Sequence, residues 1–462
     1  MADAAMRGGR SLKPVALIVC ACLLAVLAQG IFRVGGTPDV RIQPAMSVIG
    51  KRTPVTVEIA EPRRGLSRVR IELVQGEHSA PLFEKAYTPA SQIPFLGSGT
   101  VRDVIGVDAG RESLPALTGG EATIRVTSER APTWLRHPDP HVEELTLPVR
   151  LTPPSLQVRS SQTYVRQGGC EVVVYSVGES AVRDGVRAGS WWFPGFPLPG
   201  GGAHDRFALF AVPYDMDRPE VRLVAEDAAG NAAEAGFIDR FFPRPLRTDT
   251  IQVSDPFLDK VVPAIVSRTP EFRERGTLLE SYLAINREMR DANQETILAL
   301  ARKTTPGFLW RGEFVMMPNS KTTASFAQRR SYLYEGREVD VQTHLGYDLA
   351  SVRRSPVPAA NSGVVLFAGY LGIYGNAIVI DHGYGLQSIY AHLSSMDAGE
   401  GQEVSRGDVI GRTGETGLAG GDHLHFSVLL QGLPVDSIEW CDSHWIENRI
   451  ARKLGAALPG ER

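Results

Sequence analysis

Cysteine is scarce in this chain of 462 residues, and charge of neither sign is concentrated. Two of the four cysteines, Cys20 and Cys22, lie in an apolar N-terminal run, which leaves Cys170 and Cys441 as widely separated single thiols. They form neither a metal-type pair nor a disulfide framework, and two separate thiols are favoured over a bridge between them. The net charge is −3 and no basic block is present, so nucleic acid is not expected as a partner.

The sequence also shows no internal repeat of roughly 20 to 50 residues, which excludes a solenoid or a propeller. Hydrophobic residues at 43% and charged residues at 22% exclude wholesale disorder and a polytopic membrane protein. At roughly 150 residues per domain, the length predicts about three domains.

Residues 14–32 form an apolar run without a charged residue, and three basic residues, Arg7, Arg10 and Lys13, precede it. The length of this run is close to the ~20 residues that a helix needs to cross a bilayer. The basic flank predicts a cytoplasmic N-terminus over residues 1–13, followed by a transmembrane anchor or signal peptide over residues 14–33.

The anchor is the preferred interpretation, and the alternative is a signal peptide cleaved after the small residues around Ala28. Both place residues 34–462 across the membrane. The predicted location is therefore the inner (cytoplasmic) membrane, single-pass, with the bulk in the periplasm or cell wall; the alternative is a cleaved and exported protein.

Short alternating apolar segments separated by proline and glycine occupy residues 38–245. Examples are "PVTVEIA" (54–60), "ATIRVTS" (122–128) and "EVVVYSV" (171–177), which are typical of sandwich-like β structure. Pro153 and Pro154 mark a boundary between a β-sandwich module over 38–152 and a second β module over 153–245. The second module ends in "VRLVAEDAAGNAAEAGF", a hairpin that resembles bacterial immunoglobulin-like modules, although an unrelated sandwich remains an alternative.

The apolar period changes to helical spacing in residues 255–304, where "TLLESYLAINREMRDANQETILALARK" predicts a helical linker or lid. After Pro306 the glycine-punctuated β pattern returns and continues to about residue 440. The expected fold is therefore mainly β and multidomain, with a C-terminal glycine-rich antiparallel domain over residues 320–450.

Histidine is scarce too, but six of the ten lie between His344 and His444. In "GGDHLHFSV", His423 and His425 would share one face of a strand while Leu424 faces the core. "THLGYDLA" offers His344 and Asp348, both acceptable to zinc. "LQSIYAHLSS" ends a strand-like run at His392. Each motif alone is explained more readily by surface or structural residues, but three such segments in one domain are much more specific.

Four motifs together resemble the LytM/lysostaphin-type zinc metallopeptidases, which cut peptide cross-links of bacterial peptidoglycan. They are "HLGYDLA", "PVPAANSGVVLFAGYLGIYGNAIVIDHGYGLQSIYAHLSSM", "GQEVSRGDVIGRTGETG" and "GGDHLHFSV", in the family's order and spacing. The upstream "SFAQRRSYLYEG" looks like the segment that leads into that domain. The resemblance covers roughly residues 325–437.

The resemblance implies a role for each of the five residues. His344, Asp348 and His425 match the three ligands of one zinc ion, and His392 and His423 match the two catalytic histidines that do not bind metal. Three protein ligands leave one position for water, as in catalytic zinc sites. The implied activity is that of a zinc metalloendopeptidase acting on peptidoglycan stem peptides.

The sequence departs from the family pattern at several positions. Ser427 stands where an acidic residue often follows the "HLHF" motif, which puts a contact to a ligand in doubt. The usual Phe-Gly-x-Arg is Phe326-Ala327-Gln328-Arg329. Tyr334 is the tyrosine nearest to a position that stabilises the transition state in some members, but its offset is not a clean match. His382 and His444 are interpreted as structural.

Two alternatives to an enzyme remain. Glycine-turned strands also occur in lipoyl- and biotinyl-carrier domains, but a suitable tip lysine is missing. Some LytM-like proteins have lost zinc ligands and instead bind and activate other cell-wall hydrolases; the five filled positions favour an enzyme over such a regulator. Beyond the membrane and peptidoglycan, cell-wall proteins are candidate partners through the β modules.

Overall fold

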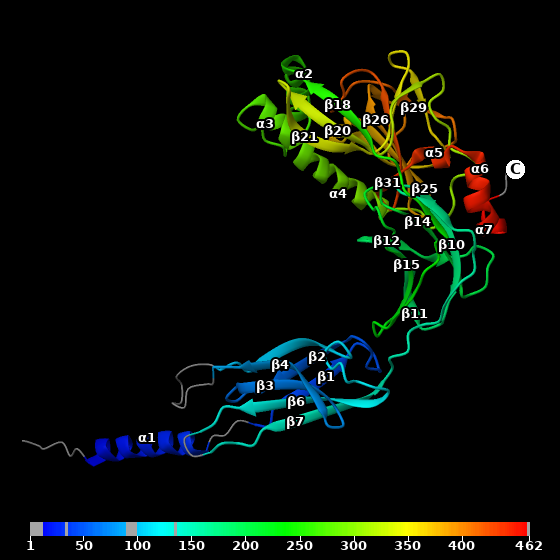
Figure 1. Ribbon diagram of the computed structural model, residues 1–462. Coiled ribbons are helices and arrows are strands. Elements are labelled where there is room, and N and C mark those ends of the chain that lie inside the picture. The colour runs from blue at the N-terminus through cyan, green and yellow to red at the C-terminus, as the bar shows by residue number, and fades with distance from the viewer. Residues whose placement is uncertain (1–12, 33–35, 89–98, 134–135, 460–462) are drawn as a thin grey trace, which may run out of the picture. The chain divides into compact units, whose positions relative to one another are not determined.

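The structure is a computed structural model that describes residues 13–32, 36–88, 99–133 and 136–459 (Figure 1). It divides into two compact units, one of residues 1–153 with 226–232 and one of residues 154–225 with 233–462. Strands outnumber helices in the described residues, which confirms the prediction of a mainly β protein.

The first unit contains two antiparallel sheets that share one apolar core. Alternation buries Val55, Val57 and Ile59 of one strand and exposes the residues between them, as the period-two pattern predicts. The first sheet has the order β1-β2-β5 and the second the order β4-β3-β6-β7. The strands are β1 (Asp39–Pro44), β2 (Thr53–Ala60), β3 (Leu66–Gln75), β4 (His78–Ala86), β5 (Arg102–Ala109), β6 (Gly120–Arg130) and β7 (His141–Val149).

The apolar N-terminal run forms helix α1 (Lys13–Phe32). Within the described ranges, none of the helices meets the length and apolarity that a membrane crossing requires. The first residues of the chain, which were predicted to be cytoplasmic, lie outside the described residues. The anchor and the signal peptide both stay predictions.

The second unit begins with two four-stranded sheets, in the orders β13-β14-β10-β8 and β12-β11-β15-β16. A two-stranded parallel ladder joins β9 to β17. The immunoglobulin-like assignment of this module stays a prediction. Its strands are β8 (Leu156–Val158), β9 (Tyr164–Arg166), β10 (Cys170–Val177), β11 (Ala181–Ala188), β12 (Trp191–Pro194), β13 (Phe196–Pro197), β14 (Asp205–Ala211), β15 (Val221–Asp227), β16 (Ala232–Ala235) and β17 (Arg240–Phe242).

An antiparallel eight-stranded sheet forms the centre of the C-terminal part, in the order β19-β22-β30-β26-β25-β24-β28, with β31 paired to β30. A small sheet, β23-β29-β27, accompanies it. The strands are β19 (Lys321–Ala324), β22 (Tyr347–Ala350), β23 (Pro356–Pro358), β24 (Gly363–Tyr370), β25 (Asn376–Gly383), β26 (Leu386–Leu393), β27 (Ser395–Met396), β28 (Glu403–Val404), β29 (Val409–Arg412), β30 (Leu424–Leu430) and β31 (Leu433–Val435).

Short helical segments supplement these strands. One 3₁₀ turn lies between β24 and β25, and the others follow β31. They are η2 (Gly372–Tyr374), α5 (Ser437–Trp440), α6 (Ser443–Ile446), the π-helix η3 (Glu447–Ala451), α7 (Arg452–Leu454) and η4 (Gly455–Ala457).

The segment predicted to be a helical linker or lid forms α2 (Asp255–Val266) and a continuous run of α3 (Leu278–Ala284), the π-helix η1 (Ile285–Met289) and α4 (Arg290–Ala301). Helix α3 begins with a capping box, because Thr277 Oγ1 accepts from the Glu280 N–H and the Glu280 carboxylate accepts from the Thr277 N–H.

These helices pack on the C-terminal part that contains the eight-stranded sheet, and they do more than link that sheet to the preceding strands (Figure 1). The strand before them, β18 (Arg247–Val253), pairs in parallel with β20 (Gln328–Tyr334), which pairs in turn with β21 (Arg337–His344). Tyr282 of α3 shares an apolar cluster with Tyr332 of β20, and Ile297 of α4 packs against the central sheet.

Candidate active site

The three predicted metal ligands converge from three strands of two sheets. His344 ends β21, Asp348 lies in β22 and His425 lies in β30, where strand pairing places Asp348 directly opposite His425. His344 Nε2 lies 2.9 Å from Asp348 Oδ1 and 3.0 Å from His425 Nδ1, and the latter lies 3.0 Å from the same Oδ1. All three residues are buried.

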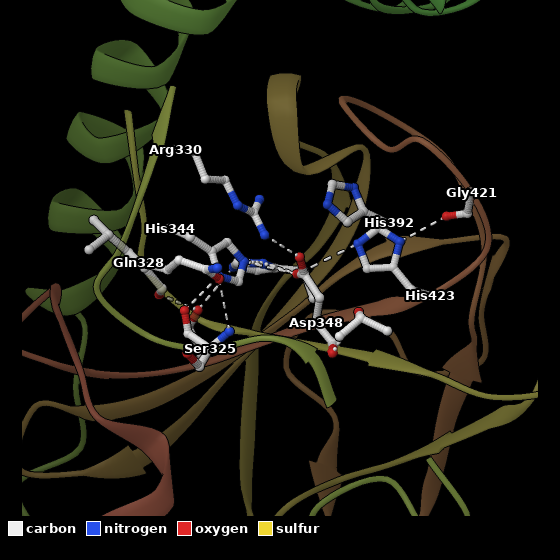
Figure 2. Close-up of polar contacts among 12 residues, drawn as sticks. Ser325, Gln328, Arg330, His344, Asp348, His392, Gly421 and His423 are labelled. Carbon is white, nitrogen blue, oxygen red and sulfur yellow. Dashed lines mark hydrogen bonds and ion pairs between the residues drawn. The ribbon is translucent and has the colours of Figure 1, made fainter. Parts of the chain in front are cut away.

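Hydrogen bonds on the far side of each imidazole fix its tautomer. His344 Nδ1 donates to the Ser325 carbonyl at 3.0 Å, which leaves a lone pair on Nε2 (Figure 2). Ser427 Oγ donates its proton to the Leu345 carbonyl at 2.7 Å, so it can only accept from His425 Nε2 at 3.0 Å. That bond leaves the lone pair of His425 on Nδ1.

Three lone-pair atoms thus face one another with no proton between them. Such an arrangement is repulsive by itself and calls for a cation at its centre. A tetrahedral zinc site with ligand distances of about 2.0–2.1 Å would space its ligand atoms by about 3.3 Å, close to the separations of 2.9–3.0 Å seen here. The donor set of two imidazoles and one carboxylate is also one that zinc accepts, so these residues fit the ion.

Protonation states at the cluster are those of metal ligands. Burial lowers the pKa of His425 to about 4, so its imidazole is neutral at pH 7. Burial by itself would raise the pKa of Asp348, but the adjacent histidines, His344 foremost, hold it well below the ordinary value. The cluster therefore combines an ionised carboxylate with a neutral imidazole, as metal binding requires.

The two histidines predicted to act on substrate lie beside this cluster. The ring centroids of His392 and His423 are 4.8 Å apart, and His423 Nε2 is 3.6 Å from Asp348 Oδ1. His392 Nδ1 donates to the Thr416 carbonyl and His423 Nδ1 donates to the Gly421 carbonyl, each at 2.8 Å. His392 therefore keeps Nε2 available for proton transfer, whereas Nε2 of His423 faces the Asp348 carboxylate.

The backbone also supports these positions. His392 has a φ of +64°, a left-handed conformation that is uncommon outside glycine and is often found at functional sites. Leu424 lies in the apolar core, as predicted from the alternation of the "HLH" motif. Burial lowers the pKa of His392 well below its ordinary value. Burial also opposes the charge on His423, but the contact with Asp348 outweighs it and raises the pKa.

Some neighbours of the cluster were missed from the sequence. Arg330 donates from Nη2 to Asp348 Oδ2 at 2.9 Å and so orients the carboxylate (Figure 2). Tyr332, two residues along β20, lines the same cavity, whereas the Tyr334 hydroxyl bonds to Asp255 instead. The period-two alternation of "RRSYLY" places Arg330 and Tyr332 on one face and was the available signal.

All five predicted site residues line one cavity of about 330 Å³, within the size range of small-molecule sites. The rest of its wall is mainly apolar and comes partly from the segment before the central sheet. The lining residues outside the five are Ile251, Gln252, Phe257, Tyr282, Arg290, Arg330, Tyr332, Ile373, Tyr374, Leu418 and Gly420. His382, by contrast, is buried away from the cavity with both ring nitrogens hydrogen-bonded.

The antiparallel sheet and the His–Asp–His cluster define a domain of the metallopeptidase class. Residues 342–437 match the model of peptidase family M23, so the chain contains an M23 peptidase domain, as the resemblance predicted.

Curated relatives are similar over part of the chain. The DD-carboxypeptidase/endopeptidase Mpg of Neisseria meningitidis serogroup B is 43% identical over 95 residues, which are 21% of this chain and 22% of that protein. The peptidoglycan DD-endopeptidase ShyA of Vibrio cholerae is 30% identical over 165 residues, 36% of this chain and 35% of that protein. The chain thus spans between about a fifth and about a third of the length of these relatives.

Two solved structures of peptidases are also similar, one to a part of this chain and the other over most of its length. The catalytic domain of lysostaphin from Staphylococcus simulans is 28% identical, and the match covers 26% of this chain and 90% of that domain with a TM-score of 0.22. A zinc-containing peptidase from Vibrio cholerae is 13% identical over 94% of this chain and 97% of that chain, with a TM-score of 0.26.

Proposed function

We propose that the chain is a zinc-dependent endopeptidase that hydrolyses peptide cross-links of bacterial peptidoglycan. The observation that carries the proposal is the convergence of three lone-pair atoms, from His344, Asp348 and His425, in the cavity that His392 and His423 also line. The relatives named as peptidoglycan DD-endopeptidases support the choice of substrate.

A zinc ion, when bound, supplies Lewis-acid polarisation of the scissile carbonyl and a water that ionises near neutral pH. The chain supplies the rest. His392 and His423 each hold the Nδ1 proton on a backbone carbonyl, so Nε2 is the atom that accepts a proton from water and passes it to the leaving amine. Arg330 keeps the Asp348 carboxylate in one orientation by donating to Oδ2.

We further propose that residues 14–33 anchor the chain in the inner membrane and that the peptidase domain acts on the outer side. The uncharged run and its basic flank support this topology. Fusions of a periplasm-dependent reporter after residue 33 and at the C-terminus should both be active; inactive reporters would contradict the proposal.

The enzymatic proposal is tested on purified full chain with peptidoglycan. Wild type should bind one zinc ion and release peptides, and His425→Ala should lose both properties. His444→Ala removes an exposed histidine away from the site and is the matched control. Full cleavage by metal-free His425→Ala protein would refute the zinc assignment.

The regulator alternative has its own outcome in the same experiment. If wild type binds zinc and cleaves no peptidoglycan, but activates a separate cell-wall amidase, the domain is a regulator. Release of new amino termini from peptidoglycan by wild type, without added amidase, establishes the enzyme.

A further inference from the structure

One wall of the cavity is built by residues that lie outside the M23 match. Phe257 of α2, Tyr282 of α3 and Arg290 at the start of α4 all line it together with the His–Asp–His cluster. These helices are held against the site by the parallel pairing of β18 with β20 and by the apolar cluster around Tyr282. The wall is therefore an integral part of the cavity.

Two hydrogen bonds hold Arg290 in this wall and leave some N–H donors of its guanidinium without an acceptor in the part of the chain that the structure describes. Its Nε donates to the Asn286 carbonyl at 3.1 Å and its Nη2 donates to Asn286 Oδ1 at 2.7 Å. The Asn286 side chain is itself fixed, because its Nδ2 donates to Asp340 at 2.8 Å. These bonds occupy one edge of the guanidinium and leave the outer edge, with one N–H on each Nη atom, for another acceptor.

No protein carboxylate meets that outer edge within the residues that the structure describes. Asp348 is the one acidic residue that lines the cavity, and it is paired with Arg330. The guanidinium is held in one orientation, is partly buried and has no carboxylate partner among the described residues. A guanidinium of this kind can bind a planar carboxylate through two parallel hydrogen bonds.

A second unused polar group points to the same conclusion. Tyr282 is fully buried, lines the cavity and has a hydroxyl without a hydrogen-bond partner in the described part of the chain. A buried hydroxyl without a partner is destabilising, and a ligand acceptor would satisfy it. The rest of the wall is mainly apolar, and of its two cationic residues Arg330 is paired with Asp348, so a ligand anion would find Arg290, beside Tyr282, as its cationic partner.

The local backbone is consistent with a functional position. Residues Ile285–Met289 form a π-helix between α3 and α4, and Arg290 follows it directly. Such bulges occur frequently at functional sites, because the extra residue turns the following side chains to a new direction. Here the bulge provides Asn286, which holds the guanidinium.

We propose that Arg290 and Tyr282 bind a free carboxylate of the substrate peptide, on the residue that supplies the amine of the scissile bond. The proposal rests on the proposed endopeptidase function and specifies its substrate class. A bond between two D-residues, whose leaving residue keeps its α-carboxylate, places an anion beside the reacting carbonyl. The cavity has the Arg290 guanidinium on one wall and the His–Asp–His cluster on another.

The test compares two synthetic cross-linked peptide dimers with full-length protein. In one dimer, the residue that supplies the scissile amine keeps its α-carboxylate; in the other, that group is a primary amide. Wild type should favour the free acid by at least about 10-fold in kcat/KM, the effect expected of a charge-assisted bidentate contact.

The variants assign this preference to the wall residues. Arg290→Gln should bring the acid-to-amide ratio close to 1, Arg290→Lys should retain part of it, and Tyr282→Phe should lower it. Arg302→Gln removes the same charge from the exposed end of α4 and should keep the wild-type ratio. Zinc content and thermal unfolding are measured for each variant, and Tyr282→Phe provides the test if Arg290→Gln fails to fold.

Two results would overturn the proposal: a wild type that does not distinguish acid from amide, or an Arg290→Gln protein that keeps the wild-type ratio. If wild type cleaves neither dimer, the proposed endopeptidase function is refuted, and the proposed carboxylate site is still to be tested. Calorimetric titration with the same two dimers then decides the carboxylate site. Tighter binding of the acid that is lost in Arg290→Gln supports it, and equal binding overturns it.

Discussion

Ser427 offers a sharp test of how the His344–Asp348–His425 cluster is arranged to bind metal. The residue is buried, and its hydroxyl joins the Leu345 carbonyl to His425 Nε2. In Ser427→Ala the imidazole loses the acceptor that keeps its proton on Nε2. The proton can then move to Nδ1, which faces Asp348 Oδ1 at 3.0 Å, and a histidine protonated there does not bind metal.

The expected loss follows from this competition. Removing a partner that orients a metal-binding histidine typically lowers metal affinity by about 10–100-fold. This range corresponds to about 1.4–2.8 kcal/mol. Two buried polar groups also lose a partner, so the free energy of unfolding of the metal-free protein should fall by about 1–3 kcal/mol or more. Zinc affinity is measured by competition with a chromophoric chelator, and stability by denaturant unfolding.

Ser388→Ala is the matched control. Ser388 is also fully buried and bonds to a histidine, with its Oγ 2.7 Å from His382 Nε2, but it does not line the metal cavity. It should lose stability by a similar amount and keep wild-type zinc affinity. Unchanged zinc affinity in Ser427→Ala, or an equal loss in Ser388→Ala, would refute the assignment of the tautomer to Ser427.

Two further predictions concern a buried acid and a close glycine contact. Burial raises the pKa of Glu439 to about 8, whereas the pKa of a glutamate in an unfolded chain is about 4.3. Between these two pH values the native state keeps a proton that the unfolded state has released. The free energy of unfolding should therefore fall as pH rises between these values, and less steeply in Glu439→Gln; equal slopes would contradict this. A Cβ on Gly346 would lie 2.6 Å from His425 Nε2, so Gly346→Ala should weaken zinc binding at least about 10-fold. Gly399→Ala, where a Cβ meets no atom within 4 Å, should not; an equal loss in both would contradict the steric argument.

The five candidate site residues were accessible from the sequence because their motifs are local. His423 and His425 share a face through strand alternation, and His344 with Asp348 spans a single turn between β21 and β22. The structure brings these residues to one cavity, while the individual roles stay predictions. The supporting contacts were not accessible in the same way. The Ser325 carbonyl, Arg330 and Ser427 depend on strand register, which a local pattern does not specify.

Ser427 also changes how one departure from the family pattern is understood. The missing acidic residue put a contact to a ligand in doubt, yet the serine hydroxyl makes that contact with His425. A small neutral acceptor is sufficient because the Leu345 carbonyl takes the hydroxyl proton.

The fold was predictable where one pattern repeats and not where distant segments meet. Alternation predicted the strands before residue 245, and helical spacing predicted the helices between residues 255 and 304. The parallel pairing of β18 with β20 joins segments about 80 residues apart and leaves no periodic signal. For that reason the sequence indicated a linker or lid, without showing that this segment lines the cavity.

The parallel pairing of β18 with β20 has a consequence for how the two sides of the cavity can vary. Every atom proposed to hold metal or move protons comes from residues after 324, whereas the helical wall comes from residues before 302. The wall can therefore be changed by substitution without altering any residue proposed to hold metal or move protons. A truncation that begins at residue 320 would keep the reaction centre but lose the partner strand of β20 and the proposed carboxylate site together, and would report on hydrolysis without selectivity.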